Sequence, residues 1–128
     1  MKQLLAGLLG VEAGQDAVMR MYLYERRDLI VHPYNFTVEE FTKRISILRN
    51  NLDMCRIKDE GIVVPPELGA EGRICTNVLA GNRDSLSYAR TPAETLRVVY
   101  GTGNEHISGG FFPEGANGEL ARMYLKEP

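Results

Sequence analysis

The sequence predicts a mainly α-helical protein, and two observations support this fold class. Two long segments in the first half place apolar residues at helical spacing. Ten of the 13 glycines and five of the six prolines follow residue 60, which predicts short elements joined by turns in the second half. A chain of 128 residues fits one domain, with long helices over residues 1–54 and a glycine-rich extension with short helices over 55–128.

The first predicted helix runs from Lys2 to about Asp28. At about 1.5 Å per residue it would be about 40 Å long, the scale of a helix in a bundle. Its glycines favour close approach by a neighbouring helix. Residues spaced alternately three and four apart form a stripe that we expect to face a core. The stripe comprises Leu5, Leu8, Glu12, Gln15, Met19 and Tyr22.

The second predicted helix has a clear start signal. Thr37 is the expected N-cap, and Glu40 stands three residues later, as a capping box requires. Phe36 and Phe41 flank the pair as a hydrophobic staple. The helix is expected to run from Val38 to about Leu52, with its own apolar stripe.

Three shorter elements are predicted in the second half. A capping box with proline at the first helical position starts a helix after Thr91, and it should end at Tyr100 with Gly101 as its cap. A further helix is expected over Ala70–Ala80, and the run Ile62–Val64 favours a short extended piece.

Composition excludes several function classes. A net charge of −2 gives no electrostatic case for a nucleic-acid partner, and no apolar run reaches the roughly 18 residues of a membrane span. Cys55 and Cys75 are too few for a disulfide framework or a four-cysteine zinc site, and they either pair or stay free. The acceptor triplet Asn35-Phe36-Thr37 predicts glycosylation only in a secreted protein, and helix capping alone explains its Thr37.

Glu12 and Gln15 are the candidate site residues, because they are polar residues on a stripe that should face a core. In ferritin-like bundles, Glu-x-x-His at this helical spacing gives two inward ligands of a di-metal centre. Here Gln15 occupies the histidine position, and an amide oxygen is a weak, uncharged ligand. The alternative interpretation is structural: either a buried, hydrogen-bonded Glu–Gln pair, or a Glu12 carboxylate that meets an arginine from elsewhere.

The segment Leu4–Val18, LLAGLLGVEAGQDAV, resembles the plant desiccation-related proteins with a ferritin-like domain. Later segments fit the same family, and the resemblance covers nearly the whole chain. They are Lys58–Gly61, Gly69–Gly72, Asn77–Gly81, Ser85–Tyr88, Arg90–Pro92, Val99–Glu105 and Gly109–Pro113. The resemblance implies a plant source and a role in dehydration or stress. It also implies that the chain begins near the fourth bundle helix and supplies a fragment of the bundle, followed by one more helix and a loop-rich C-terminal extension.

The resemblance supports three functional hypotheses. We expect a stress-associated, non-enzymatic protein without a cofactor. The enzyme alternative is catalase-like or oxidase activity at a di-iron or di-manganese centre that another chain completes, with Glu12 and Gln15 at the degenerate metal position. A secreted cell-wall or carbohydrate-binding module is the third hypothesis, and the absence of tryptophan counts against it.

The partner and the compartment complete the expectations. The long apolar face of the first helix predicts a homo-oligomer or a complex with a helical partner. Proteins of this family are typically secreted. The apolar start Leu4–Val11 resembles a signal peptide, but a structural helix is favoured because the helical periodicity continues past the possible cleavage site. Localisation therefore stays open.

Overall fold

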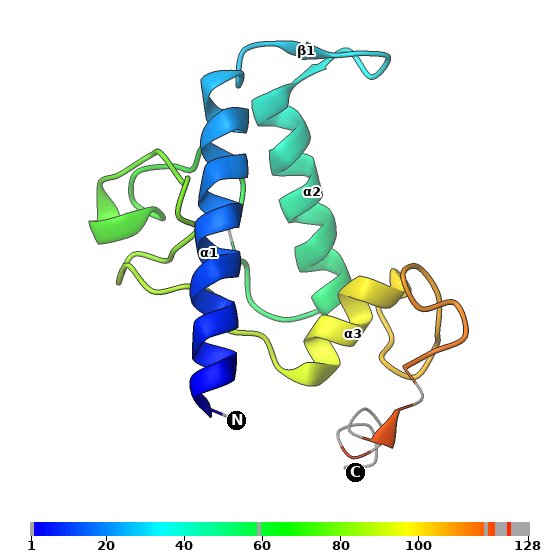
Figure 1. Cartoon of the computed structure of the whole chain (residues 1–128). Helices are drawn as coiled ribbons and strands as arrows, with labels where there is room; N and C mark the ends of the chain where they lie inside the picture. The colour runs from blue at the N-terminus through cyan, green and yellow to red at the C-terminus, as the bar shows by residue number, and fades with distance from the viewer. Residues whose placement is uncertain (1, 59, 117, 120–122, 124–128) are drawn as a thin grey trace. The chain divides into compact units, whose positions relative to one another are not determined.

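The computed structural model describes residues 2–58, 60–116, 118–119 and 123, and the mainly helical prediction is confirmed. The chain forms two compact units. That the two units make up one domain stays a prediction. Unit 1 comprises Met1–Ile45 and Asp59–Ser87, and unit 2 comprises Ser46–Lys58 and Tyr88–Pro128. The elements are α1 (Lys2–Glu25), β1 (Ile30–Val31), β2 (Phe36–Thr37), α2 (Val38–Asp53), the 3-10 turn η1 (Ala70–Gly72) and α3 (Pro92–Tyr100) (Figure 1).

A short hairpin connects α1 to α2, and the sequence did not predict it. Strands β1 and β2 pair antiparallel, with Ile30 opposite Thr37 and Val31 opposite Phe36. Each strand has only two residues, which is too short for alternation of apolar and polar residues to identify it.

Helix α2 starts as predicted, with half of the expected capping box. The backbone N–H of Glu40 donates to the Thr37 hydroxyl at 3.2 Å, so Thr37 caps the helix. The Glu40 carboxylate instead accepts from Arg44 Nε at 2.8 Å. The Arg44 guanidinium in turn lies 3.9 Å from the centre of the Phe36 ring. The contact between Phe36 and Phe41 as a staple stays a prediction.

The extended piece at residues 62–64 is confirmed. The Val64 N–H donates to the Cys75 carbonyl at 3.0 Å, and the Asn77 N–H donates to the Ile62 carbonyl at 2.9 Å. The side chains of Ile62 and Val64 are both buried in unit 1.

The predicted helix over residues 70–80 is wrong. Only the single turn η1 forms, and inside it Glu71 adopts a left-handed conformation with φ of 58°. A helix cannot continue through that residue, and residues 75–77 are already paired with 62–64. The spacing of apolar residues favoured a helix because spacing alone does not show that residues 75–77 form backbone hydrogen bonds with another segment.

Helix α3 is confirmed from Pro92 to Tyr100. Its capping box is complete: Thr91 Oγ1 accepts from the Glu94 N–H at 3.3 Å, and the Glu94 carboxylate accepts from the Thr91 N–H at 2.5 Å. Gly101 ends the helix with φ of 67°, a left-handed conformation that glycine adopts without strain.

The expectation that the apolar stripes of the first two helices face a core is wrong for the structure of this chain. No described residue of α1 is buried, and α2 buries Ser46 and Asp53 rather than its apolar stripe. In the part of the chain that the structure describes, the buried large apolar side chains are Ile62 and Val64 in unit 1 and Tyr100 in unit 2.

Candidate functional site

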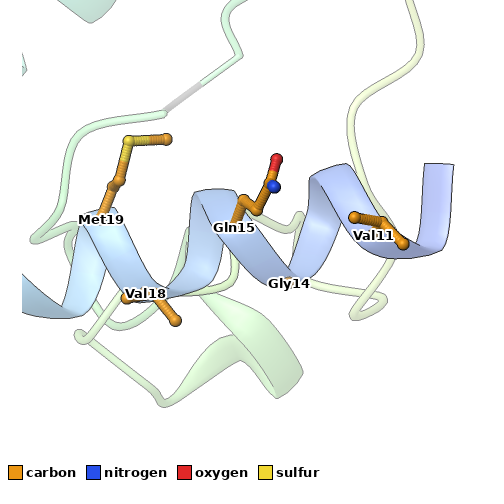
Figure 2. Close-up of a pocket in the computed structure, with 5 residues that line it drawn as sticks. All are labelled: Val11, Gly14, Gln15, Val18 and Met19. Carbon is orange, nitrogen blue, oxygen red and sulfur yellow. The ribbon is translucent and has the colours of Figure 1, made fainter. Parts of the chain in front are cut away.

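The predicted site residues Glu12 and Gln15 both lie exposed on α1. Gln15 lines an apolar hollow of about 580 Å³ on the helix surface, together with Val11, Gly14, Val18 and Met19. Figure 2 shows that all five residues come from α1 itself. Gln15 is the one polar side chain among these five lining residues, so an occupant of the hollow would meet apolar surface around a single amide.

The hollow belongs to a longer apolar face. Residues at successive steps of four and three form its centre, and large side chains flank it. Residues on such a stripe lie on one side of a helix. The centre comprises Leu4, Leu8, Val11, Gln15, Val18 and Tyr22, and the apolar residues among them are between 53% and 76% exposed. We call this set the α1 face.

The opposite side of α1 contacts the rest of unit 1. Ala17, Arg20 and Tyr24 are half-buried and share one stripe. The Arg20 guanidinium donates to the backbone carbonyls of Gly61 and Asn77 at 3.0 Å each, which ties the helix to the segment after residue 60. Tyr24 follows Gln15 by nine residues, which is two and a half turns at about 100° per residue. The two side chains therefore lie on opposite sides of α1, and the α1 face points away from this contact.

The donor set near Glu12 does not fit a di-metal centre by itself. Such a centre in a ferritin-like bundle takes carboxylates from two helices and a Glu-x-x-His pair from each of two others. Glu12 and Gln15 supply one carboxylate and one amide. Among the described residues, no group of three or more histidine, cysteine, aspartate or glutamate side chains is placed to hold a metal ion. The two residues could contribute only part of a ligand set.

A second cluster, which we call the Asp53 cluster, lies in unit 2 and was not predicted. The Asp53 side chain is fully buried. One carboxylate oxygen accepts the Cys55 N–H at 2.9 Å, and the other lies 3.2 Å from Arg90 Nε and 3.6 Å from Lys58 Nζ. Lys58 Nζ also donates to Glu94 at 3.0 Å, so the cluster joins the end of α2 to the start of α3.

Hydrogen bonds keep Glu94 ionised in this cluster. The Cys55 thiol, the Thr91 N–H and the Lys58 ammonium donate to its carboxylate and lower its pKa from 4.5 to about 2, against the opposing effect of burial. Glu94 therefore serves two purposes, since its carboxylate also completes the capping box of α3.

A charged pair extends the cluster to the loop after α3. Arg97 donates through Nε and Nη2 to the two carboxylate oxygens of Glu105, at 2.6 and 3.0 Å. This hydrogen bonding lowers the pKa of Glu105 to about 2 and raises that of Arg97 above its usual value. Arg97 also donates to the backbone carbonyl of Asp53 at 2.9 Å. Each of these charges has an opposite charge beside it, as expected of a structural network.

One sequence signal could have found the cluster. Ser46, Asn50 and Asp53 are spaced four and three apart, so they form a polar stripe on α2. The Asn50 amide brackets the backbone of Lys58, accepting its N–H at 3.0 Å and donating to its carbonyl at 3.1 Å. A polar stripe is usually a solvated face, and the pattern alone does not show that the chain folds back over it.

Of the two cysteines, Cys55 belongs to the Asp53 cluster, whereas Cys75 lies in the segment that pairs with Val64 in unit 1. Cys55 and Cys75 are free thiols, which settles the alternative left open by their spacing. His32 and His106, the two histidines of the chain, lie in turns. Asn35 is exposed in the turn between β1 and β2, with φ of 57°. Among the helices that the structure describes, none has the length and apolar character needed to cross a membrane.

Comparison with known proteins identifies relatives along almost the entire chain. The chain is 64% identical over 124 residues to a ferritin-like catalase of Nesocodon mauritianus, covering 97% of this chain and 40% of that protein. It is 48% identical over 118 residues to a desiccation-related protein of Craterostigma plantagineum, covering 92% of this chain and 38% of that protein.

The chain thus spans about two fifths of the length of these curated relatives. No family model and no solved structure matches it. The two relatives agree with the family that the sequence motifs indicated and with the helical structure. Over nearly its whole length the chain is therefore homologous to part of the plant desiccation-related and ferritin-like proteins.

Proposed function

We propose that this chain is a stress- and desiccation-associated interaction protein, that the α1 face is its interaction surface, and that it carries out no metal-dependent peroxide chemistry by itself. The observation that carries the proposal is the exposure of the α1 face. Val18 is 72% exposed and Leu4 is 76% exposed, on a helix whose opposite side holds the contacts to unit 1. A contiguous apolar surface of this kind favours association with a second apolar surface.

The partner is either a second copy of the chain or another protein that presents a helix. A helical face with apolar residues at steps of three and four fits the groove between such residues on another helix. The desiccation-related name of one relative supports a role under water loss, when proteins are concentrated and weak association becomes effective.

An assay of protection during drying tests the interaction. A dehydration-sensitive enzyme is dried and rehydrated with and without the chain, and its retained activity is measured. The chain should protect, and Val18→Asp should lose much of that protection. The matched control Ala13→Asp places the same charge elsewhere on α1, at another exposed position. Equal protection by both variants would contradict the assignment of the α1 face.

The second candidate function is peroxide turnover at a di-iron or di-manganese centre completed by another chain. The name of the relative at 64% identity favours it, as does the Glu-x-x-Gln spacing of Glu12 and Gln15. In that case the two residues would supply part of the ligand set, and the other carboxylates and histidines would come from elsewhere.

Metal analysis and peroxide assays separate the two functions. The purified chain is loaded with iron(II) or manganese(II), dialysed and assayed for oxygen release from hydrogen peroxide. We expect neither retained metal nor turnover. About two retained equivalents with turnover, lost in Glu12→Ala but kept in the matched α1 variant Asp16→Ala, would overturn the non-enzymatic proposal.

A further inference from the structure

The centre of the α1 face carries a heptad pattern. Positions 4, 8, 11, 15, 18 and 22 alternate steps of four and three, the spacing of the two core positions of a coiled coil. The pattern spans about 28 Å at about 1.5 Å per residue. Five of the six positions are apolar, and Gln15 is the single polar residue near the middle.

Gln15 restricts the arrangement of a partner helix. Once a helix covers the face, the Gln15 amide is removed from water and needs a hydrogen-bonding partner, because a buried unpaired amide is unfavourable. In a parallel, in-register pair of identical helices, each core residue meets its own counterpart, so the two Gln15 amides can donate to and accept from each other. In an antiparallel pair Gln15 would instead face Val11 or Val18.

The flanks of the face also suit a parallel pair. Gly7, Gly14 and Met21 occupy one flanking position of each heptad, and Leu5, Glu12 and Met19 occupy the other. In a parallel pair these two flanks face each other, and no like charges meet. Apart from the adjacent residues and the backbone of α1 itself, no heavy atom lies within 4 Å of the place where a Cβ on Gly7 or Gly14 would stand, so a second backbone can approach closely there.

The exposed area is of a suitable size. Seven large apolar side chains on and beside the stripe are each more than half exposed: Leu4, Leu5, Leu8, Val11, Val18, Met19 and Tyr22. Covering them would remove several hundred square ångströms per chain from water, of the order of the roughly 800 Å² per partner in a standard interface.

We infer that the α1 face binds a second copy of this chain as a parallel, two-fold symmetric helix pair in which the two Gln15 side chains hydrogen-bond to each other. This inference rests on the proposed function, since it names the partner of the same surface.

A charge-exchange experiment tests the pairing. Sedimentation equilibrium of the intact chain at micromolar concentration should show a dimer. Gln15→Glu and Gln15→Lys should each weaken dimerisation about tenfold or more, because like charges would face each other. An equimolar mixture of the two variants should restore dimerisation to about the original level, because opposite charges then meet.

The chain offers a matched control. Gln3 is also an exposed glutamine on α1, and it lies outside the heptad stripe. Gln3→Glu and Gln3→Lys should leave the dimer unchanged. Since position 15 is exposed within the single chain, its variants should keep the helical circular dichroism signal of the original.

Three results would overturn the inference: a monomeric chain with its helical signal intact, a dimer insensitive to charge at position 15, or weakened variants that mixing does not restore. The last result indicates an antiparallel pair or a different helical partner. None of these results decides the proposed function, because drying protection and peroxide turnover are measured separately.

Discussion

The α1 face and the Asp53 cluster use burial in opposite ways. The α1 face leaves large apolar side chains exposed, whereas the cluster buries three charged side chains: Asp53 fully, and Lys58 and Glu94 to within 8% exposure. The charges of the cluster are satisfied inside unit 2, since each has an oppositely charged neighbour at 3.0 to 3.6 Å. The α1 face has no comparable cover from the described residues of unit 1.

This difference indicates which region is completed by residues of its own chain and which can be covered by another molecule. Hydrogen-bonded ion pairs are directional, and their geometry in unit 2 is completed by residues of α2, α3 and the connecting segments. Apolar surface is satisfied by any well-fitting apolar surface, so the α1 face can be covered by another molecule. The predictions below test whether the first region is self-contained and the second is not.

The largest effect is expected from Asp53→Ala. It would leave Arg90 and Lys58 without their shared carboxylate in a buried site, which is expected to lower the free energy of unfolding by about 3–5 kcal/mol. Chemical denaturation measures this change. Asp28→Ala is the matched control: Asp28 has an 84% exposed side chain, and its removal should change stability by less than about 0.5 kcal/mol. Equal effects of the two substitutions would show that the cluster does not stabilise the fold.

Acid should weaken the same cluster gradually. The pKa values of Glu94 and Glu105 are lowered to about 2, below the ordinary 4.5 of an unfolded glutamate. The stability from their ionised forms is fully present above about pH 4.5 and is lost as the pH falls toward 2, because the unfolded chain binds protons first. Denaturation midpoints measured between pH 6 and 2 should fall mainly below 4.5. In Glu94→Gln this decline should be smaller, and an unchanged decline would contradict the role of Glu94.

Arg20→Ala tests the contact on the opposite side of α1. The substitution removes hydrogen bonds from a charged donor to the backbone carbonyls of Gly61 and Asn77, for an expected loss of about 2 kcal/mol. Arg83→Ala, at an exposed position, serves as the control and should have little effect. Thermal unfolding that is equal for both variants would mean that Arg20 does not hold the segment after residue 60.

The smallest effects are expected at the helix caps. Thr91→Ala and Thr37→Ala should each lower the free energy of unfolding by about 1 kcal/mol, and Thr91→Ala should have the larger effect because its capping box is complete. Thr91→Ser and Thr37→Ser keep the hydroxyl and should restore most of the loss. If serine fails to restore stability, the hydroxyl hydrogen bond is not the cause.

Local signals predicted most of the helical structure. The starts of α2 and α3 follow from Thr37 and Thr91, and the end of α3 follows from Gly101, because capping depends on residues close in sequence. Local signals did not predict the hairpin of β1 and β2. They predicted the extended piece at residues 62–64 but not its pairing with Cys75. Both features depend on which distant or short segments meet in the folded chain. The false helix at residues 70–80 has the same cause.

The candidate site shows the same limit. The spacing of Glu12 and Gln15 correctly placed both on one stretch of helix, but not the direction in which that stretch points. The spacing of apolar residues identifies a helix face that is more stable when buried, but it does not identify the segment or molecule that packs against that face. The Asp53 cluster could not be predicted because Asp53 and Arg90 meet across 37 positions of sequence.

Hydrogen exchange at two protein concentrations tests most directly whether the α1 face is covered by a second copy while the Asp53 cluster is complete within one chain. Between dilute and micromolar protein, amide protection in α1 from Leu8 to Tyr22 should rise with concentration, because pairing slows opening of the helix. Protection in α3 from Glu94 to Tyr100 should stay the same. Protection of α1 that does not change with concentration, in a chain that remains folded, would contradict the account.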